Sequence, residues 1–127
     1  MLKKIIKSSR VPLPIGPYNQ AVVINNLIYT AGQIAIDSKS GVVIDGGITE
    51  QTKLVLDYVK AILKEAGSSL KNVVKATVFL KNMNDFQAMN AVYSQYFEAA
   101  TAPARSTIEV ARLPKDVLVE IEVVASL

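Results

Sequence analysis

The sequence predicts one α+β domain, spanning residues 1–127, in which two helices cover one face of a two-layer, mixed β-sheet. Two observations predict this class. Several segments alternate apolar and polar residues with the period of a strand, and two segments repeat apolar residues with the period of a helix. Each helical segment stands between strand-like segments, and such crossovers place helices against a sheet. The length of 127 residues is sufficient for one hydrophobic core.

Residues 21–36 open the regular structure with two β-branched runs around Asn25-Asn26. Asparagine tolerates a positive φ better than most residues do, so this pair predicts a tight hairpin. The composition of residues 37–41, which read DSKSG, then indicates a turn.

The first helix is expected to follow Thr49 as its N-cap, with Glu50 in the first turn and Gly67 as the residue that stops it. Its apolar residues fall on one face at helical spacing, and they are Val55, Val59, Ile62, Leu63 and Ala66.

The second half of the chain predicts a strand, a helix and two further strands. Residues 72–81 form the strand, and residues 84–100 form the helix, capped by Asn84 or Asp85. Residues 103–125 supply the last two strands, joined by the segment RLPKD. The expected buried stripe of the helix contains Phe86, Met89, Val92, Tyr93 and Tyr96.

The predicted sheet carries valine, isoleucine and leucine on both faces, whereas two helices cover only one of them. The second face therefore needs another cover. We expect it to pack against further copies of the chain in a cyclic oligomer, either a dimer or a trimer.

The composition excludes several kinds of site. The chain has no cysteine and no histidine, which rules out disulfides, thiol nucleophiles, Cys/His zinc sites and histidine-containing triads. A general acid or base must then be Asp, Glu, Lys or Tyr, or else a water molecule held by the backbone. The net charge of +3 is modest and the lysines are scattered, which argues against a nucleic-acid partner. No segment approaches the ~20 apolar residues of a membrane span, so we expect a cytoplasmic protein without a membrane partner.

Two carboxylates interrupt the last strand-like run. Positions 117, 119, 121 and 123 are all Val or Ile, and the opposite face carries Glu120 and Glu122 between Leu118 and Val124. A solvated sheet face is one interpretation of this pattern. The apolar residues on either side favour a partly covered surface, such as a cleft between subunits. A carboxylate in that setting can position or deprotonate a water molecule.

Arg105 begins the preceding strand and shares a face with Thr107 and Glu109. It is either an edge arginine in a surface ion pair or a guanidinium that binds a carboxylate or phosphate bidentately. If RLPKD leads into an antiparallel neighbour, Arg105 and Glu120 fall into one neighbourhood, but the sequence does not fix the register.

Residues 13–21, which read LPIGPYNQA, predict a rigid loop between prolines that displays Tyr18. This loop is either plain turn punctuation or the wall of a small-molecule pocket.

Taken together, the stretches IGPYNQA, YTAGQIAID, VVKATVFLKNMNDFQAMNAVYSQYF and PARSTIEVARLPKDVLVEIEVVA resemble the Rid family of reactive intermediate deaminases, also called YjgF proteins. The resemblance runs from near residue 3 to the C-terminus. It implies the α+β fold of Bacillus-type chorismate mutase, assembled as a homotrimer with clefts between subunits. It also implies hydrolysis, without cofactor or metal, of 2-imino acids to 2-keto acids and ammonia; 2-iminopropanoate, formed from 2-aminoacrylate, is one such substrate.

The resemblance further implies roles for individual residues. Arg105 would bind the substrate carboxylate, and Glu120 would hold the attacking water and take its proton. Tyr18 would wall the pocket and hydrogen-bond the water or the substrate. The other positions that the resemblance assigns to substrate binding are Thr107, Gly32, Ala31 and Asn90.

Two positions depart from the family pattern. Many members have a serine where this chain has Ala31, so one hydroxyl contact is lost. Many also have a cysteine where this chain has Thr107; threonine suffices if the backbone acts at that position, but not if the thiol does.

Two other functions stay open at this point. One is a regulatory trimer that binds 2-keto acids without turnover. The other is an endoribonuclease or translation inhibitor, an activity described for some members of the family, although a chain without histidine lacks the usual acid–base pair for RNA cleavage.

Overall fold

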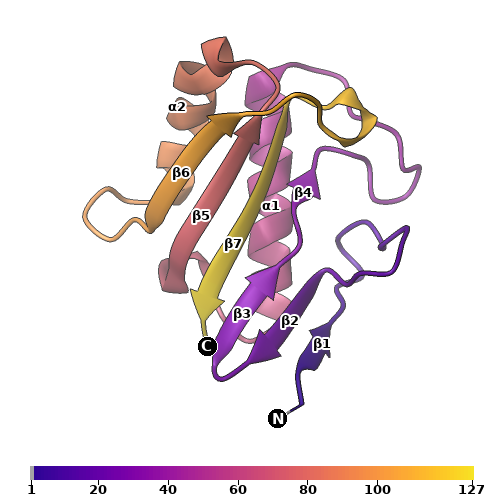
Figure 1. Cartoon of the computed structure of the whole chain (residues 1–127), viewed down its shortest axis with the longest axis vertical. Coiled ribbons are helices and arrows are strands. Elements are labelled where there is room, and N and C mark those ends of the chain that lie inside the picture. The colour runs from indigo at the N-terminus through magenta and orange to yellow at the C-terminus, as the bar shows by residue number, and fades with distance from the viewer. Residues whose placement is uncertain (1) are drawn as a thin grey trace.

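The computed structural model describes residues 2–127, which form seven β-strands and two α-helices (Figure 1). Short 3₁₀ turns precede β5, α2 and β7. The elements in chain order are β1 (Lys4–Ile6), β2 (Ala21–Ile24), β3 (Leu27–Thr30), β4 (Gln33–Ile34), α1 (Ile48–Glu65), β5 (Val73–Leu80), α2 (Phe86–Tyr96), β6 (Ala104–Glu109) and β7 (Val119–Ser126).

One mixed sheet contains all seven strands, in the order β1-β2-β3-β7-β5-β6, and β4 pairs with β7 beyond the end of β3. β5 and β6 are parallel, whereas the other paired strands are antiparallel. Figure 1 shows both helices behind the sheet, and α2 makes the crossover from β5 to β6. The α+β class with two helices on one face of a mixed sheet is therefore confirmed.

The hairpin predicted at Asn25-Asn26 is present between β2 and β3. Asn25 has a φ of 51° and Asn26 a φ of 63°, and two successive positive values are the geometry of a type I′ turn. The turn predicted at residues 37–41 is also present, and Gly41 adopts a φ of 72° there.

The N-cap of α1 is Gly47 and not the predicted Thr49. The side chain of Glu50 accepts a hydrogen bond of 2.8 Å from the Gly47 N–H, so Glu50 caps the start of the helix from within its first turn. Gly67 ends the helix as predicted, with a φ of 85°. In residues 2–127, no helix is long and apolar enough to cross a membrane.

The second helix is shorter than predicted. Asp85 is its N-cap, as expected, but α2 ends at Tyr96 and does not reach residue 100. Phe97 leaves the helix with an extended backbone because its side chain packs into the core, where it is 7% exposed.

β5 separates β6 from β7, so the last two strands are not neighbours. Ala76 of β5 pairs with Arg105, and Phe79 of β5 pairs with Glu120. Paired residues point to the same side of a sheet, and residues three apart on one strand point to opposite sides. The condition under which Arg105 and Glu120 would share a neighbourhood, an antiparallel pairing of the last two strands, is therefore not met, and within one chain the two residues lie on opposite faces of the sheet.

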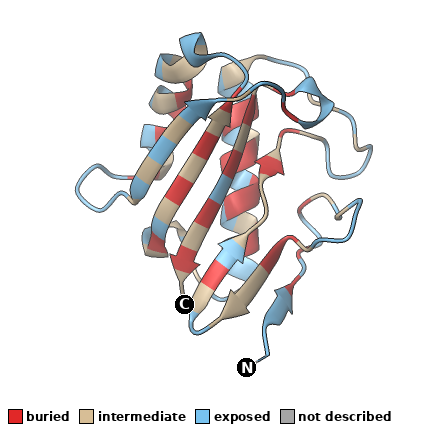
Figure 2. Ribbon diagram, viewed as in Figure 1, coloured by how far each residue is buried: buried red, intermediate tan, exposed pale blue. Residues whose placement is uncertain are grey.

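The core lies between the helices and the sheet, and burial alternates along β7 as predicted (Figure 2). Val119, Ile121 and Val123 are buried on the helix-covered face. The other face is open in the single chain. Tyr29 and Ile108, which lie on it, are 43% and 44% exposed.

Candidate active site

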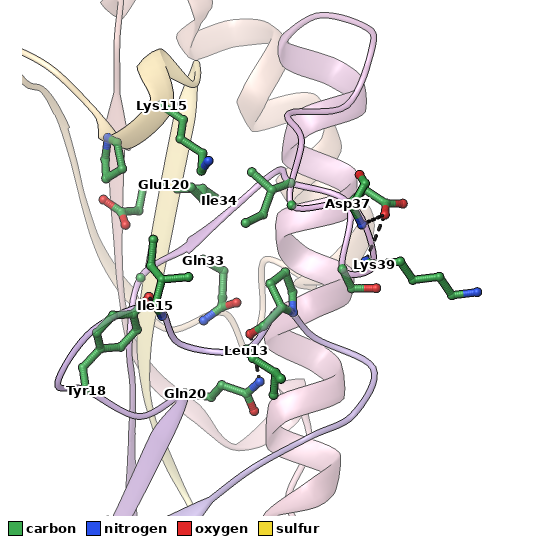
Figure 3. Close-up of a pocket in the computed structure, with 17 residues that line it drawn as sticks. Leu13, Ile15, Tyr18, Gln20, Gln33, Ile34, Asp37, Lys39, Lys115 and Glu120 are labelled. Atoms are coloured by element: carbon green, nitrogen blue, oxygen red, sulfur yellow. Dashed lines mark hydrogen bonds between the residues drawn. The ribbon is translucent and has the colours of Figure 1, made fainter.

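A cavity of about 390 Å³ lies where residues 12–20, the loop after β4 and the turn before β7 meet (Figure 3). Glu120, Tyr18 and Gly32 all line it, so the structure brings these three predicted site residues together. Ile15 and Ile34 contribute apolar walls to the same cavity, and two lysines, Lys39 and Lys115, also line it.

Gly32 lies in the gap between β3 and β4, directly beside Glu120. A Cβ atom at this position would lie 2.5 Å from Oε2 of Glu120, closer than real side chains approach. At this gap, the Val123 N–H of β7 has no backbone carbonyl to pair with on the neighbouring strand. It donates a 3.0 Å hydrogen bond to the Thr30 hydroxyl instead. A glycine here therefore allows the Glu120 carboxylate to lie against the backbone.

Glu120 is half-buried, and its environment favours the protonated form. Burial of the carboxyl raises its pKa above the ordinary value, and the neighbouring carboxylate of Glu122 raises the pKa further. A carboxylate with a raised pKa accepts a proton more readily. It also stays protonated up to a pH closer to neutral, where it can donate that proton. Glu120 is thus suited to move a proton.

Tyr18 stands on a loop that the buried side chain of Gln20 fixes in place. Gln20 is only 2% exposed, and its Oε1 accepts a 2.6 Å hydrogen bond from the Ser8 N–H. Its Nε2 donates to three carbonyl oxygens, at 3.2, 3.3 and 3.0 Å, those of Ser8, Val11 and Pro12. The loop therefore presents Tyr18, which is 51% exposed, from a rigid base.

Arg105 lies on the other face of the sheet, beneath α2. Its Nη1 donates a 2.8 Å hydrogen bond to Oδ1 of Asn90. Its Cζ lies 4.5 Å from the ring centroid of Tyr93 and 5.5 Å from that of Phe86, both within cation–π range. Asn90, which the family resemblance assigned to the substrate, thus contacts the guanidinium of Arg105. β6 is an edge strand, so this cluster lies at the margin of the sheet.

The two positions that depart from the family pattern have different surroundings. Thr107 follows Arg105 on the helix side of β6, and its buried hydroxyl has no hydrogen-bond partner within residues 2–127. Ala31 precedes Gly32, and its backbone N–H donates a 2.8 Å hydrogen bond to the Gln20 carbonyl. Ala31 therefore connects the Tyr18 loop to the gap between β3 and β4.

Lys115 is a cavity residue that the sequence did not single out. It adopts a φ of 55° in the turn before β7, and its side chain lines the cavity (Figure 3). The bidentate ion pair of Arg112 with Asp116, at 2.8 and 3.1 Å, braces this turn. The RLPKD segment marked the turn, but no local pattern indicated which way Lys115 points.

Residues 8–127 match the family model described as endoribonuclease L-PSP. A RutC family protein of Synechocystis is 57% identical over 128 residues, covering 100% of this chain and 98% of that protein. A human protein named 2-iminobutanoate/2-iminopropanoate deaminase is 44% identical over 125 residues, covering 98% of this chain and 90% of that one. The chain belongs to this family, the Rid (YjgF/RutC) family.

Solved structures agree with this assignment. A Rid family protein of Yersinia pestis superimposes with a TM-score of 0.95 at 41% identity, covering 99% of this chain and 100% of that one. The protein TdcF of E. coli, solved with bound serine, gives a TM-score of 0.90 at 43% identity, with 98% of each chain covered. A Thermotoga maritima protein described as a candidate endoribonuclease gives a TM-score of 0.95 at 47% identity, covering 99% of this chain and 98% of that one.

Proposed function

We propose that this protein hydrolyses 2-imino acids, of the class of 2-iminopropanoate and 2-iminobutanoate, to 2-keto acids and ammonia. The observation that supports this most directly is the half-buried Glu120 carboxylate with a raised pKa, next to Tyr18 and Gly32 in one cavity. Relatives named as deaminases of 2-iminobutanoate and 2-iminopropanoate support the substrate class. Serine bound to TdcF supports recognition of an α-carboxylate carried next to a nitrogen substituent.

The proposed reaction uses the residues on both faces of the sheet. Arg105 binds the substrate carboxylate through two parallel hydrogen bonds. Glu120 takes a proton from a water molecule, whose oxygen attacks the imine carbon while the C=N electron pair moves to nitrogen. Glu120 then returns the proton to the nitrogen of the carbinolamine. The C–N bond breaks, the C=O bond forms, and the hydroxyl proton leaves with the ammonia.

The protonated imine carbon is already electrophilic, so orientation can supply much of the catalysis. Placing the water and the carbon in contact makes the attack effectively unimolecular, which is worth about 7–11 kcal/mol in well-oriented intramolecular reactions. Gly32 keeps the carboxylate of Glu120 close to the backbone, and Gln20 fixes the loop of Tyr18.

The proposal requires a second copy of the chain. Arg105 and Glu120 lie on opposite sheet faces of one chain, with the strand β5 between theirs. Arg105 lies on an edge strand, where its guanidinium can face a neighbour. We therefore infer that Arg105 of one copy, together with Asn90, completes the Glu120 cavity of the next, within the homotrimer that the family resemblance implies.

The test is ammonia release from imines that an amino acid oxidase generates in situ, compared with buffer alone. The protein should accelerate the release. Arg105→Ala should lower kcat/KM by about 100-fold, because a half-buried, charged hydrogen-bond donor to the substrate carboxylate is lost. Arg105→Lys should recover only part, since a point charge does not replace the planar guanidinium. Glu120→Gln should lower kcat more than it changes KM.

Arg10→Ala is the matched control, because Arg10 is an exposed arginine outside the cavity and should leave the kinetics unchanged. An Arg105→Ala variant that keeps most of its activity would remove the carboxylate-binding role. A wild-type protein that binds 2-oxobutanoate without accelerating ammonia release would instead be a binding trimer, and the enzymatic proposal would fail.

A further inference from the structure

The guanidinium of Arg105 is held by more than a hydrogen bond. One edge donates to Asn90 at 2.8 Å, and aromatic rings from the same helix lie against it. Tyr93 is the nearer ring, with its centroid 4.5 Å from Cζ, compared with 5.5 Å for Phe86. The closer contact is thus made by the more deeply buried ring, because Tyr93 is 5% exposed and Phe86 is only partly buried.

Tyr93 is itself fixed from behind. Its ring centroid lies 4.6 Å from that of Phe97, in a tilted arrangement, and both side chains belong to the hydrophobic core. A buried aromatic residue has two side-chain torsions, and packing on both sides restricts them. Tyr93 therefore offers a rigid surface to Arg105, whereas a long arginine side chain alone has several rotatable bonds.

The hydroxyl of Tyr93 is buried and has no hydrogen-bond partner among the described residues, 2–127. Burial raises the pKa of this phenol, and the positive charge of Arg105 opposes that rise in pKa, which agrees with a neutral ring beside the guanidinium. A neutral ring keeps its attraction for a cation without forming an ion pair that would compete with a substrate carboxylate.

We propose that Tyr93 is a positioning residue that holds the Arg105 guanidinium in the plane and direction needed to bind a carboxylate. This inference rests on the proposed function for its catalytic consequence, but the positioning itself is a property of the protein alone. Asn90 fixes one end of the guanidinium and Tyr93 its plane, so the remaining N–H donors are left free for a ligand.

The test compares Tyr93→Met with Phe97→Met. Both variants replace one ring of the same aromatic pair with a flexible side chain of similar bulk, but only Tyr93 lies against Arg105. Tyr93→Met should weaken binding of 2-oxobutanoate, measured by calorimetry, by about 3- to 30-fold. It should raise KM much more than it lowers kcat. Tyr93→Phe, which keeps the ring, should restore both values to near those of the wild type.

A second readout needs no ligand. The Nε–H resonance of Arg105, assigned by its loss in Arg105→Lys, should report an ordered side chain in the wild type and the most mobile one in Tyr93→Met. Phe97→Met should fall between them, because Tyr93 keeps its ring against Arg105 but loses the ring that packs behind it. If Tyr93→Met does not fold, Phe86→Met at the partly buried second ring takes its place, with a smaller expected effect because of the longer distance.

The outcomes separate this inference from the proposed function. Equal losses of binding in Tyr93→Met and Phe97→Met, or an equally ordered Arg105 in Tyr93→Met, would overturn the positioning role. A wild type that neither binds 2-oxobutanoate nor hydrolyses imines would refute the proposed function, whereas the Arg105 resonance would still decide the role of Tyr93.

Discussion

At the scale of single residues, the two charges of the proposed site have contrasting environments. Arg105 has its partners already in place in one chain, namely Asn90 and the aromatic rings of α2. Glu120 is half-buried beside another carboxylate, an environment that disfavours its charge. This difference is expected, because a group that binds a charged ligand keeps its own charge, whereas a group that transfers protons needs a pKa near the working pH.

Glu122→Gln should shift the pH dependence of activity. The carboxylate of Glu122 raises the pKa of Glu120, because a second negative charge disfavours ionisation. Glu120 acts as a base only when ionised, so activity falls as the pH drops through its pKa. Removing the charge of Glu122 lowers that pKa, and the acid limb of kcat/KM should move to lower pH.

The measurement is the profile of kcat/KM against pH for wild type, Glu122→Gln and Glu65→Gln, the last removing an exposed carboxylate from α1. An acid limb that stays in place in Glu122→Gln, or that moves equally in Glu65→Gln, would show that the limb does not belong to Glu120.

Gly32→Ala should displace the carboxylate of Glu120. The added Cβ would lie 2.5 Å from Oε2, so the glutamate side chain must rotate away. We expect kcat to fall about 10- to 100-fold through lost alignment of the water, with little change in 2-oxobutanoate binding. Gly47→Ala is the control, because a Cβ there is 3.9 Å from its nearest neighbour. A normal kcat in Gly32→Ala would contradict the tight placement of Glu120.

At the scale of elements, the loop that carries Tyr18 is held by one glutamine side chain. Gln20→Leu should destabilise the protein by about 2–4 kcal/mol, since buried backbone groups of residues 8, 11 and 12 lose their partners. Chemical denaturation measures this loss of unfolding free energy. Activity should fall further than stability alone explains, because the loop no longer holds Tyr18.

Gln33→Leu provides the comparison for Gln20→Leu. Gln33 is also buried, at 7% exposure, but its side chain donates one long hydrogen bond of 3.3 Å to the Ala31 carbonyl. Loss of this hydrogen bond should lower the free energy of unfolding by about 1 kcal/mol. Equal destabilisation by the two substitutions would mean that the multiple hydrogen bonds of Gln20 do not determine the loop.

The helices, the hairpin and the alternation along β7 could be predicted because each depends on residues close in sequence. The cap of α1 was missed because a side chain three residues inside the helix, Glu50, satisfies the Gly47 N–H. The strand order could not be read, since it depends on β5 pairing with β6 on one side and β7 on the other. For the same reason, Tyr93 was identified only as a core residue, and its contact with Arg105 emerged from the packing of α2 on β6.

At the scale of the whole molecule, the sheet has one covered face and one open face. The open face carries exposed apolar residues, including Tyr29 and Ile108, together with the Glu120 cavity. The edge formed by β6 carries Arg105. An assembly that brings this edge to the open side of another copy would bury apolar surface and complete the site in one step.

Mixed assembly tests this arrangement. Arg105→Ala and Glu120→Ala chains should each be inactive as pure trimers. Unfolded together at equal amounts and refolded, they should regain about one quarter of the wild-type activity. In a randomly mixed cyclic trimer, each cleft takes Arg105 from one copy and Glu120 from its neighbour, and each of these residues is intact in about half of the copies. Light scattering would establish the trimeric mass of each sample.

The control for mixed assembly combines the two substitutions in one chain and refolds it with the wild type. That mixture should retain about one quarter of its clefts as well, since both neighbours must then be wild type. No recovery from the two single-substitution chains would place the whole site within one copy and overturn the shared-cleft arrangement.

The Thr30 hydroxyl that accepts the Val123 N–H has a consequence for the central strand. Amide protons of β7 that donate to neighbouring strands exchange with solvent only when the sheet opens, whereas the Val123 proton depends on one side-chain oxygen beside Gly32. Deuterium should therefore exchange at the Val123 amide earlier than expected for a strand that lies between β3 and β5. Thr30→Val should accelerate exchange at this amide alone. The strand that carries Glu120 would then open most easily three residues from the carboxylate that we propose as the base.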